Sequence, residues 1–232
     1  MHITPSFDLF SKSKQLVLDN LNILWPFFLL QLLFLMNNWL TNPASVHGTN
    51  RVGYDITGHS VGIASPTFPN YSWSLFLGIG FFAIIWIVVS IIFQIMLQRA
   101  QLDIIEGKKS SFSHLWATVK ELGWRMVGLY LLTGLYILIG LILIIPGIIM
   151  FRRYFLAPYV MLDRKCSIKE AMERSAAISK PYSGYIWGVI GVMVLISLLG
   201  IIPFIGSLVA FVVGALYSLA PALRYQELKK LS

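Results

Sequence analysis

Charged residues are scarce in this chain. They make up 12% of its 232 residues, whereas hydrophobic residues make up 57%, and soluble domains usually carry about a quarter charged residues. The mean hydropathy is +0.75. These values exclude a soluble globular protein and predict an integral membrane protein. Cysteine is almost absent as well, because Cys166 is the only one, and a single cysteine excludes an intrachain disulfide.

Catalytic and metal-binding motifs are also missing. The sequence contains no Gly-x-Ser-x-Gly, His-Glu-x-x-His, Walker or Gly-x-Gly-x-x-Gly motif. His47, Asp55 and His59 share one polar segment, but their spacing matches no zinc signature. We therefore expect a protein that is not an enzyme and that holds no metal and no cofactor.

Acidic residues are absent from the apolar runs of the sequence. Six runs approach or exceed the length needed to cross about 30 Å of hydrocarbon, and none contains Asp or Glu. This absence argues against proton- and cation-coupled transporters, which commonly place an ionisable residue at membrane depth. The whole chain, residues 1–232, is predicted to be a single membrane domain with spans at residues 23–40, 73–97, 126–145, 148–162, 185–202 and 204–222. The run 148–162 is the shortest of them.

The basic residues predict the orientation of these spans. The net charge is +8, with 18 Lys and Arg residues, and all but Arg51, Arg152 and Arg153 fall in the segments 1–22, 98–125, 164–180 and 224–230. The positive-inside rule assigns these segments to the cytoplasm, so both termini are expected there and the polar loop 41–72 is expected outside. The excess charge therefore indicates topology and attraction to anionic membrane lipids, and no nucleic acid is expected as a partner.

A similar unit occurs three times along the chain. Each unit opens with a short basic segment, at residues 6–12, 111–120 and 167–175, and continues into two apolar runs. Apolar residues recur at three- and four-residue spacing around these openings, which predicts amphipathic helices at the membrane surface. The expected fold is all-α: six transmembrane helices arranged as three hairpins, each preceded by a cytoplasmic interfacial amphipathic helix.

Local signals predict how these elements begin and turn. Pro146 and Gly147 suit the two central positions of a tight turn, with Gly147 at positive φ, and residues 203–206 suit a second turn. Ser167 is placed to cap the following helix, and Glu170, three residues later, completes a capping box.

Small residues predict where helices approach closely. A ridge of small side chains, spaced four residues apart, runs along the last span, and a shorter one begins the fifth. Two alternatives stay open for these ridges: packing within the bundle, or a homo-oligomer formed through the last span. The residues concerned are Gly206, Ala210, Gly214 and Ser218, with Gly184 and Gly188.

Several polar residues in or near the spans are candidates for a binding site. Arg152 and Arg153 either reach back to the lipid headgroups by snorkelling or bind a lipid phosphate or another anion. They are expected to lie about 8 to 9 Å below the Pro146 turn, near the outer headgroups. The main amides, Gln31, Gln94, Asn37 and Asn38, are expected to bond between helices, with a substrate role as the alternative.

Part of the sequence resembles a bacterial family. The resemblance rests on Ile-Pro-Gly-Ile-Ile at 145–149, Leu-Ala-Pro-Tyr-Val-Met-Leu-Asp at 156–163, and Ser-Ile-Lys-Glu-Ala-Met-Glu-Arg-Ser at 167–175. Residues 98–225 resemble the six-span membrane domain that is fused to some glycerophosphodiester phosphodiesterases, and the related stand-alone YciC-like membrane proteins. The resemblance implies a multi-pass protein of the bacterial cytoplasmic (inner) membrane. It supplies no catalytic residues, and we expect the phosphodiesterase activity to be absent because the chain leaves no room for that domain.

Three functions follow as hypotheses. The first is a non-enzymatic inner-membrane module that interacts with lipids or supports envelope homeostasis. The alternative is a small-molecule transporter or channel, since transporter folds also repeat and break their helices. A third is an enzyme acting on lipid headgroups, with Asp163, Arg164 and Glu170 as the only clustered polar residues at an interface.

Overall fold

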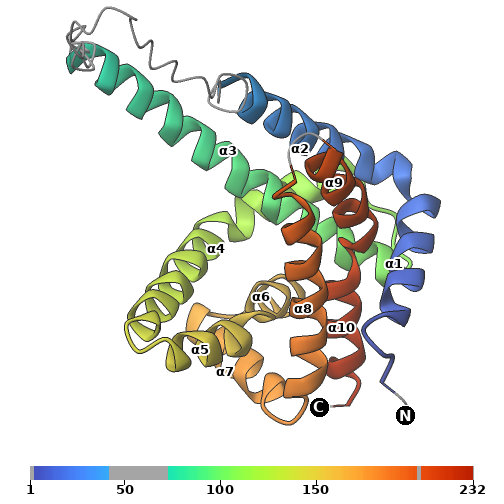
Figure 1. Ribbon diagram of the computed structural model, residues 1–232. Coiled ribbons are helices and arrows are strands. Elements are labelled where there is room, and N and C mark those ends of the chain that lie inside the picture. The colour runs from blue at the N-terminus through green and yellow to red at the C-terminus, as the bar shows by residue number, and fades with distance from the viewer. Residues whose placement is uncertain (1–2, 42–72, 203–204, 232) are drawn as a thin grey trace, which may run out of the picture.

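The computed structural model describes residues 3–41, 73–202 and 205–231, and every regular element in these ranges is a helix (Figure 1). The loop 41–72 lies outside the described residues from residue 42 onward, as do His47, Asp55, His59 and residues 203 and 204 of the predicted second turn. The helices are α1 (Asp8–Asp19), α2 (Leu21–Thr41), α3 (Trp73–Ile105), α4 (Phe112–Leu141), α5 (Ile145–Tyr154), α6 (Ala157–Arg164), α7 (Ile168–Ser179), α8 (Ser183–Leu199), α9 (Ile205–Tyr217) and α10 (Ala220–Lys229).

Several of these helices are long and apolar enough to cross a membrane. In the described part of the chain, three stretches qualify on their own, namely Ile85–Ile105, Phe112–Leu141 and Ile205–Lys229. Two further spans are added if the bent pairs α1–α2 and α7–α8 each count as one. The all-helical fold is thus confirmed, and its apolar helices are compatible with a membrane protein. The predicted fourth span, 148–162, is divided between α5 and α6, and neither qualifies alone.

Proline and asparagine decide where the surface helices break from the apolar ones. The chain bends by 102° between α7 and α8, where Pro181 cannot supply the amide hydrogen that a continuous helix needs. A bend of 101° separates α1 from α2 at Asn20, whose side-chain amide donates to the Leu16 carbonyl. Residues 111–120 have no such break before the next apolar run, so the predicted surface helix and the predicted span 126–145 form one continuous helix, α4.

The turn between α4 and α5 differs from the predicted one. Pro146 and Gly147 lie inside α5, and the residue with positive φ is Ile144, at 55°. Gly147 serves a different purpose, because a Cβ built on it would lie 2.6 Å from the Leu141 amide nitrogen, and one built on Gly140 would lie 2.7 Å from the Gly147 Cα. The glycines therefore let the backbones of the two helices touch, and the prediction of positive φ at Gly147 was wrong.

A Leu-Ala-Pro sequence interrupts the helices at two places. It begins α6 at residues 156–158 and α10 at residues 219–221, and Leu156 and Leu219 have similar backbone angles of −92°, −4° and −81°, −11°. Proline is favoured in the first turn of a helix, where its missing amide hydrogen has no partner to lose. The same three residues thus redirect the chain after α5 and after α9.

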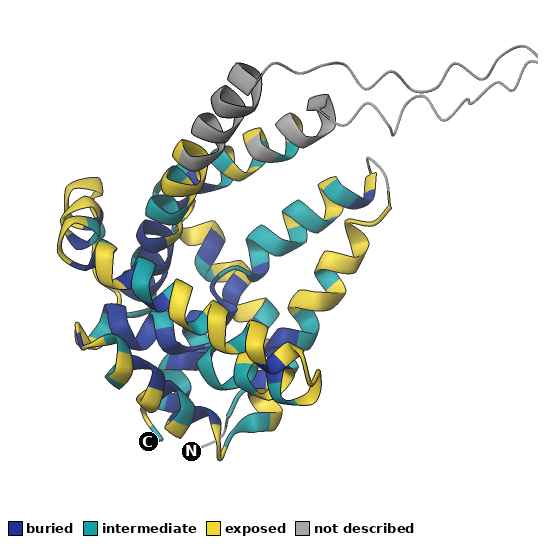
Figure 2. Ribbon diagram, turned by 90° about the vertical axis from the view of Figure 1, so that its left-hand side faces the viewer, coloured by how far each residue is buried: buried dark blue, intermediate teal, exposed yellow. Residues whose placement is uncertain are grey.

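Burial divides the molecule into two regions (Figure 2). The region we call the base consists of α1, α6, α7 and α10 with the adjoining parts of α3, α4 and α8, and it holds most of the buried apolar side chains. Three helix pairs, which we call arms, extend from it: α2 with the first part of α3, the second part of α4 with α5, and the second part of α8 with α9. Large apolar side chains on the arms are exposed, for example Leu138 at 66% and Ile142 at 77%.

The arms diverge from the base. The α2–α3 arm points toward the upper left of Figure 1, whereas the α4–α5 arm lies at the lower left beside α7. The predicted arrangement of six spans as three hairpins is not confirmed by this geometry and stays a prediction.

Candidate functional site

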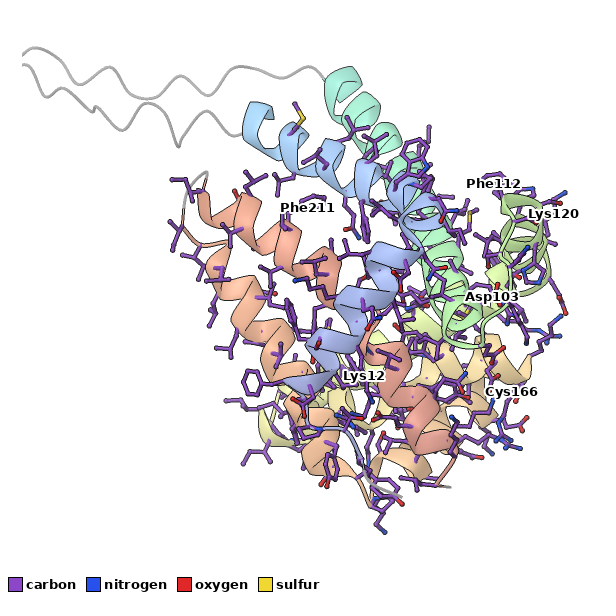
Figure 3. All side chains as sticks on the ribbon, turned by 90° about the vertical axis from the view of Figure 1, so that its right-hand side faces the viewer. Lys12, Asp103, Phe112, Lys120, Cys166 and Phe211 are labelled. Atoms are coloured by element: carbon purple, nitrogen blue, oxygen red, sulfur yellow. The ribbon has the colours of Figure 1, made fainter. Side chains whose placement is uncertain are left out.

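A buried carboxylate organises one side of the base (Figure 3). Asp103, in the last turn of α3, is 1% exposed. Its carboxylate pairs with the Arg99 guanidinium at 2.9 Å, accepts a hydrogen bond from the Ser110 hydroxyl at 2.5 Å, and lies 3.3 Å from Nδ1 of His114 on α4. Arg99 also donates to the Leu162 carbonyl at 3.1 Å. This cluster joins α3, α4 and α6, and the ion pair and hydrogen bond of its acid are made with structural partners.

A second carboxylate joins α6 to α10. Asp163 accepts a hydrogen bond from the Tyr225 hydroxyl at 2.7 Å and pairs with the Lys229 ammonium at 2.7 Å. Burial raises the pKa of Asp163, but the hydrogen bonds and the positive charge of its partners lower it by more, so the net pKa lies below its usual value. The carboxylate therefore stays ionised, which suits an ion pair and not a general acid.

The N-terminal segment is held by a buried arginine of α10. The Arg224 side chain is fully buried; it pairs with Glu227 at 2.8 Å and donates to the Thr4 carbonyl at 2.8 Å. Its guanidinium also lies over the Tyr185 ring, 5.4 Å from the centroid. The two ends of the described chain are thereby fixed to each other in the base.

Arg152 and Arg153 form the last turn of α5, and this turn packs on α7. The backbone carbonyl of Arg153 accepts hydrogen bonds from the hydroxyls of Ser175 at 2.6 Å and Ser179 at 3.4 Å, both of which are buried. With ten residues, α5 is about 15 Å long and cannot cross about 30 Å of hydrocarbon by itself. The arginines therefore lie on the α7 side of the molecule, so they cannot reach the outer headgroups if α7 is cytoplasmic as predicted.

The arginine pair has no acidic partner within the described residues. The Nε atoms of both arginines are buried without a hydrogen-bond partner. Seven basic and three acidic residues occur between positions 145 and 184, and each acid pairs elsewhere. Asp163 binds Lys229, and two pairs within α7 use the others: Glu170 with Arg174, and Glu173 with Lys169. An uncompensated positive charge therefore remains on α5.

A cavity of about 430 Å³ lies beside this turn, between α4, α5 and α7. Tyr136 and Tyr154 form one wall, with ring centroids 6.1 Å apart, and the α7 side chains Lys169, Met172 and Glu173 line the other. The cavity combines aromatic walls with charges at α7, which suits an amphiphilic molecule.

The small residues of the last span face α8. A side chain on Gly206 would collide with the Leu199 carbonyl and Ile202, and one on Gly214 would lie 3.7 Å from Ile196. Ala210, Gly214 and Ser218 also line a cavity of about 250 Å³ against α8. The ridge therefore contacts its own chain, and the homo-oligomer through the last span stays a prediction. Of the shorter ridge, Gly188 abuts Ser6, and a Cβ on Gly184 would meet nothing within 4 Å.

The polar residues proposed for lipid-headgroup chemistry do not converge. Asp163 faces α10 and Glu170 pairs with Arg174 within α7, while burial raises the pKa of the Cys166 thiol.

Sequence reasoning missed Asp103, although its spacing of four residues from Arg99 on one helix is the usual signal of an ion pair. Within the described ranges, no group of three or more His, Cys, Asp or Glu side chains could hold a metal ion.

Comparison of the chain with protein-family models, with curated proteins and with solved structures found no match.

Proposed function

We propose that the chain is a non-enzymatic membrane protein that binds the phosphate of an anionic lipid with Arg152 and Arg153. The observation that carries this proposal is that two arginines, consecutive in the last turn of α5, have no acidic partner among the described residues. A charge in or near a membrane is costly unless it is paired, and every acid between positions 145 and 184 is already used. An anion supplied by the membrane would complete the site.

The chemistry of the pair favours phosphate. A guanidinium group donates parallel hydrogen bonds to two oxygens of one phosphate, and these charge-assisted bonds are stronger than neutral ones. The cavity beside Tyr136 and Tyr154 offers room for the apolar part of the same lipid.

Native mass spectrometry of the purified protein tests the proposal. We expect phosphatidylglycerol to bind in preference to phosphatidylethanolamine. Arg152→Leu and Arg153→Leu, tested singly, should each weaken that binding by about 10-fold or more, since a charged hydrogen bond contributes about 1.5–3 kcal/mol. Arg152→Lys should retain more of the phosphatidylglycerol binding than Arg152→Leu but less than the wild type, because an ammonium group keeps the charge but lacks the planar fork of the guanidinium group.

Arg125→Leu is the matched control, because Arg125 is exposed on α4 and makes no ion pair with a described residue. Its loss removes one positive charge without touching α5. Equal binding of both lipids, or an equal effect of Arg125→Leu, would reject the site and leave snorkelling as the role of the pair.

A further inference from the structure

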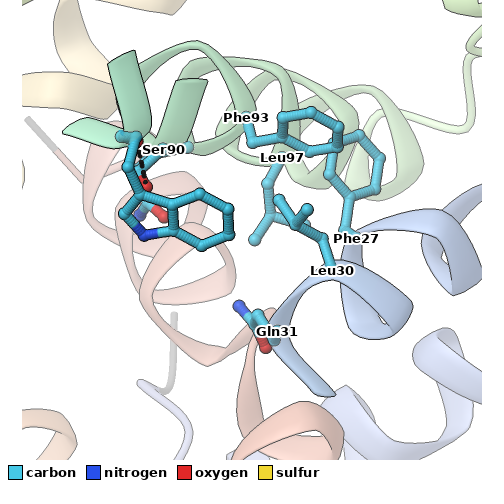
Figure 4. Close-up of a pocket in the computed structure, with 8 residues that line it drawn as sticks. Phe27, Leu30, Gln31, Ser90, Phe93 and Leu97 are labelled. Carbon is cyan, nitrogen blue, oxygen red and sulfur yellow. Dashed lines mark hydrogen bonds between the residues drawn. The ribbon is translucent and has the colours of Figure 1, made fainter. Parts of the chain in front are cut away.

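A narrow groove runs between α2 and α3, away from the arginine pair (Figure 4). It is lined along α3 by side chains that share one helical face, at spacings of four, seven, eight and eleven residues. These are Trp86, Ser90, Phe93, Gln94 and Leu97. Across from them, Phe27 and Leu30 of α2 point toward Phe93 and Leu97, and the rings of Phe27 and Phe93 lie 5.9 Å apart.

The dimensions of the groove limit what it can hold. From Trp86 to Leu97 the helix rises about 16 Å, so a cavity volume of about 310 Å³ corresponds to a cross-section of about 19 Å². A helix with its side chains is about 10–12 Å wide and needs roughly 80 Å² or more. The groove is thus too narrow to enclose a helix of a partner protein or of a second copy along its length, and its volume suits one extended chain.

Two glutamine side chains place polar groups in the otherwise apolar groove. Gln31 lies at the midpoint of α2, ten residues from either end, and Gln94 lies on the facing side of α3. Within the described part of the chain, neither amide makes a hydrogen bond. An amide without a partner is unfavourable in hydrocarbon, where no water can replace it. Because a glutamine amide can both donate and accept, a ligand that carries a polar group on an otherwise apolar body suits the groove.

We propose that the groove between α2 and α3 binds one acyl chain of a membrane phospholipid. The chain lies along the aromatic walls and past Gln31, and an ester carbonyl of the lipid accepts a hydrogen bond from the amide of Gln94, which lies three residues from the end of the predicted span 73–97. A neutral amide forms a hydrogen bond with a neutral carbonyl, so this site recognises the glycerol ester region of the lipid and not the charge of its headgroup. The inference requires α2 and α3 to lie in the bilayer but does not depend on Arg152 and Arg153.

Photo-crosslinking of the full chain in lipid nanodiscs tests this site. The probe is phosphatidylcholine with a diazirine on one acyl chain, whose zwitterionic headgroup gives the arginine pair no net negative charge to select. We expect the α2 and α3 segments 27–31 and 86–97 to be labelled at least about 5-fold more than the largely exposed segment 138–145, which runs from the end of α4 to the start of α5. Equal labelling of these segments would overturn the proposal.

Two variants locate the label within the groove. Leu30→Trp fills the groove and should reduce its labelling at least about 5-fold, whereas Gln94→Leu removes one hydrogen bond and should reduce it about 2- to 10-fold. Leu33→Trp is the matched control, because Leu33 is 52% exposed on α2 and does not line the groove. Gln94 is exposed, so its replacement leaves the core intact.

The outcomes are distinguishable. Labelling that persists in both groove variants, or that falls equally in Leu33→Trp, overturns the proposal. Labelling of the groove by a diazirine fatty acid but not by the phospholipid probe overturns the assignment to a phospholipid.

Discussion

The base and the arms bury their side chains in different ways. In the base, polar side chains from distant parts of the sequence bind one another, as Tyr159 does with Gln101 at 3.1 Å and Tyr225 with Asp163 at 2.7 Å. In the arms, large apolar side chains such as Ile142 and Ile205 are more than 70% exposed. Apolar contacts add little between helices that lipid already surrounds. The base should therefore provide most of the stability, and the arms should depend on the bilayer for their cover.

Breaking the Asp103 cluster should have the largest effect. Asp103→Leu leaves the partly buried Arg99 guanidinium without its carboxylate, and loss of one partner of a buried pair costs about 3–5 kcal/mol. The midpoint of thermal unfolding in detergent measures the loss, with the intrinsic fluorescence of the tryptophans as signal.

The exposed pair of Glu121 and Lys165 supplies the control. Their side chains are 52% and 55% exposed, and such surface pairs contribute about 0–1 kcal/mol. Glu121→Leu should therefore change stability little. The double variant Arg99→Leu/Asp103→Leu should recover part of the loss, because no unpaired charge remains. If Glu121→Leu destabilised as much as Asp103→Leu, the base would not be the more strongly coupled region.

Shortening one leucine in each region gives the next largest effect. Leu156 is fully buried in the base and Leu138 is 66% exposed on the α4–α5 arm. Leu156→Ala should lose about 2–5 kcal/mol through the cavity it leaves. Leu138→Ala should change the unfolding midpoint in detergent by less than the equivalent of about 0.5 kcal/mol, as surface substitutions usually do. Similar losses at both positions would mean that the arms also pack within the chain.

Features that depend on neighbouring residues could be predicted from the sequence. Apolar runs predicted the helices and the membrane character of the chain. The N-cap at Ser167 is confirmed, since its hydroxyl accepts from the Glu170 amide, but the Glu170 carboxylate pairs with Arg174, so the other half of the predicted capping box stays a prediction. Both features depend on residues close together in the chain. Proline likewise indicated a break, but its exact role did not follow: Pro146 lies within α5 and the positive φ falls on Ile144.

Contacts between distant residues could not be predicted in the same way. The Tyr130 hydroxyl donates to Gln98 at 2.8 Å across 32 positions, and Arg224 reaches Thr4 across 220. Which tyrosine meets which amide depends on how the helices cross, and an apolar helix without a polar face offers no preferred side to fix that crossing. The same ambiguity explains why the direction of the α4–α5 arm, and with it the α7 side of Arg152 and Arg153, did not follow from composition.

Lowering the pH should have the smallest effect on stability, and it should act on the base and not on the arms. All acidic residues of the described ranges lie outside the predicted spans, so protonation acts on the base and leaves the arms unchanged. The folded-state pKa of Asp163 is lower than usual because Lys229 and Tyr225 stabilise the carboxylate more than burial destabilises it. A lowered pKa contributes stability that is fully present above the unfolded pKa, near 3.8, and is lost as the pH falls through the lower folded value.

The comparison of the wild type with Asp163→Asn isolates this contribution. Near pH 6 the wild type should unfold about 2–4 °C higher, the equivalent of about 1 kcal/mol for a chain of this size and a partly exposed pair. The difference should shrink as the pH falls below about 4, because the protonated carboxyl no longer attracts Lys229. Lys229→Met should show the same loss of pH dependence. A difference that stays constant down to pH 3 would mean that Asp163 holds α10 through the Tyr225 hydrogen bond alone, and the ionic part of the link between α6 and α10 would then contribute nothing.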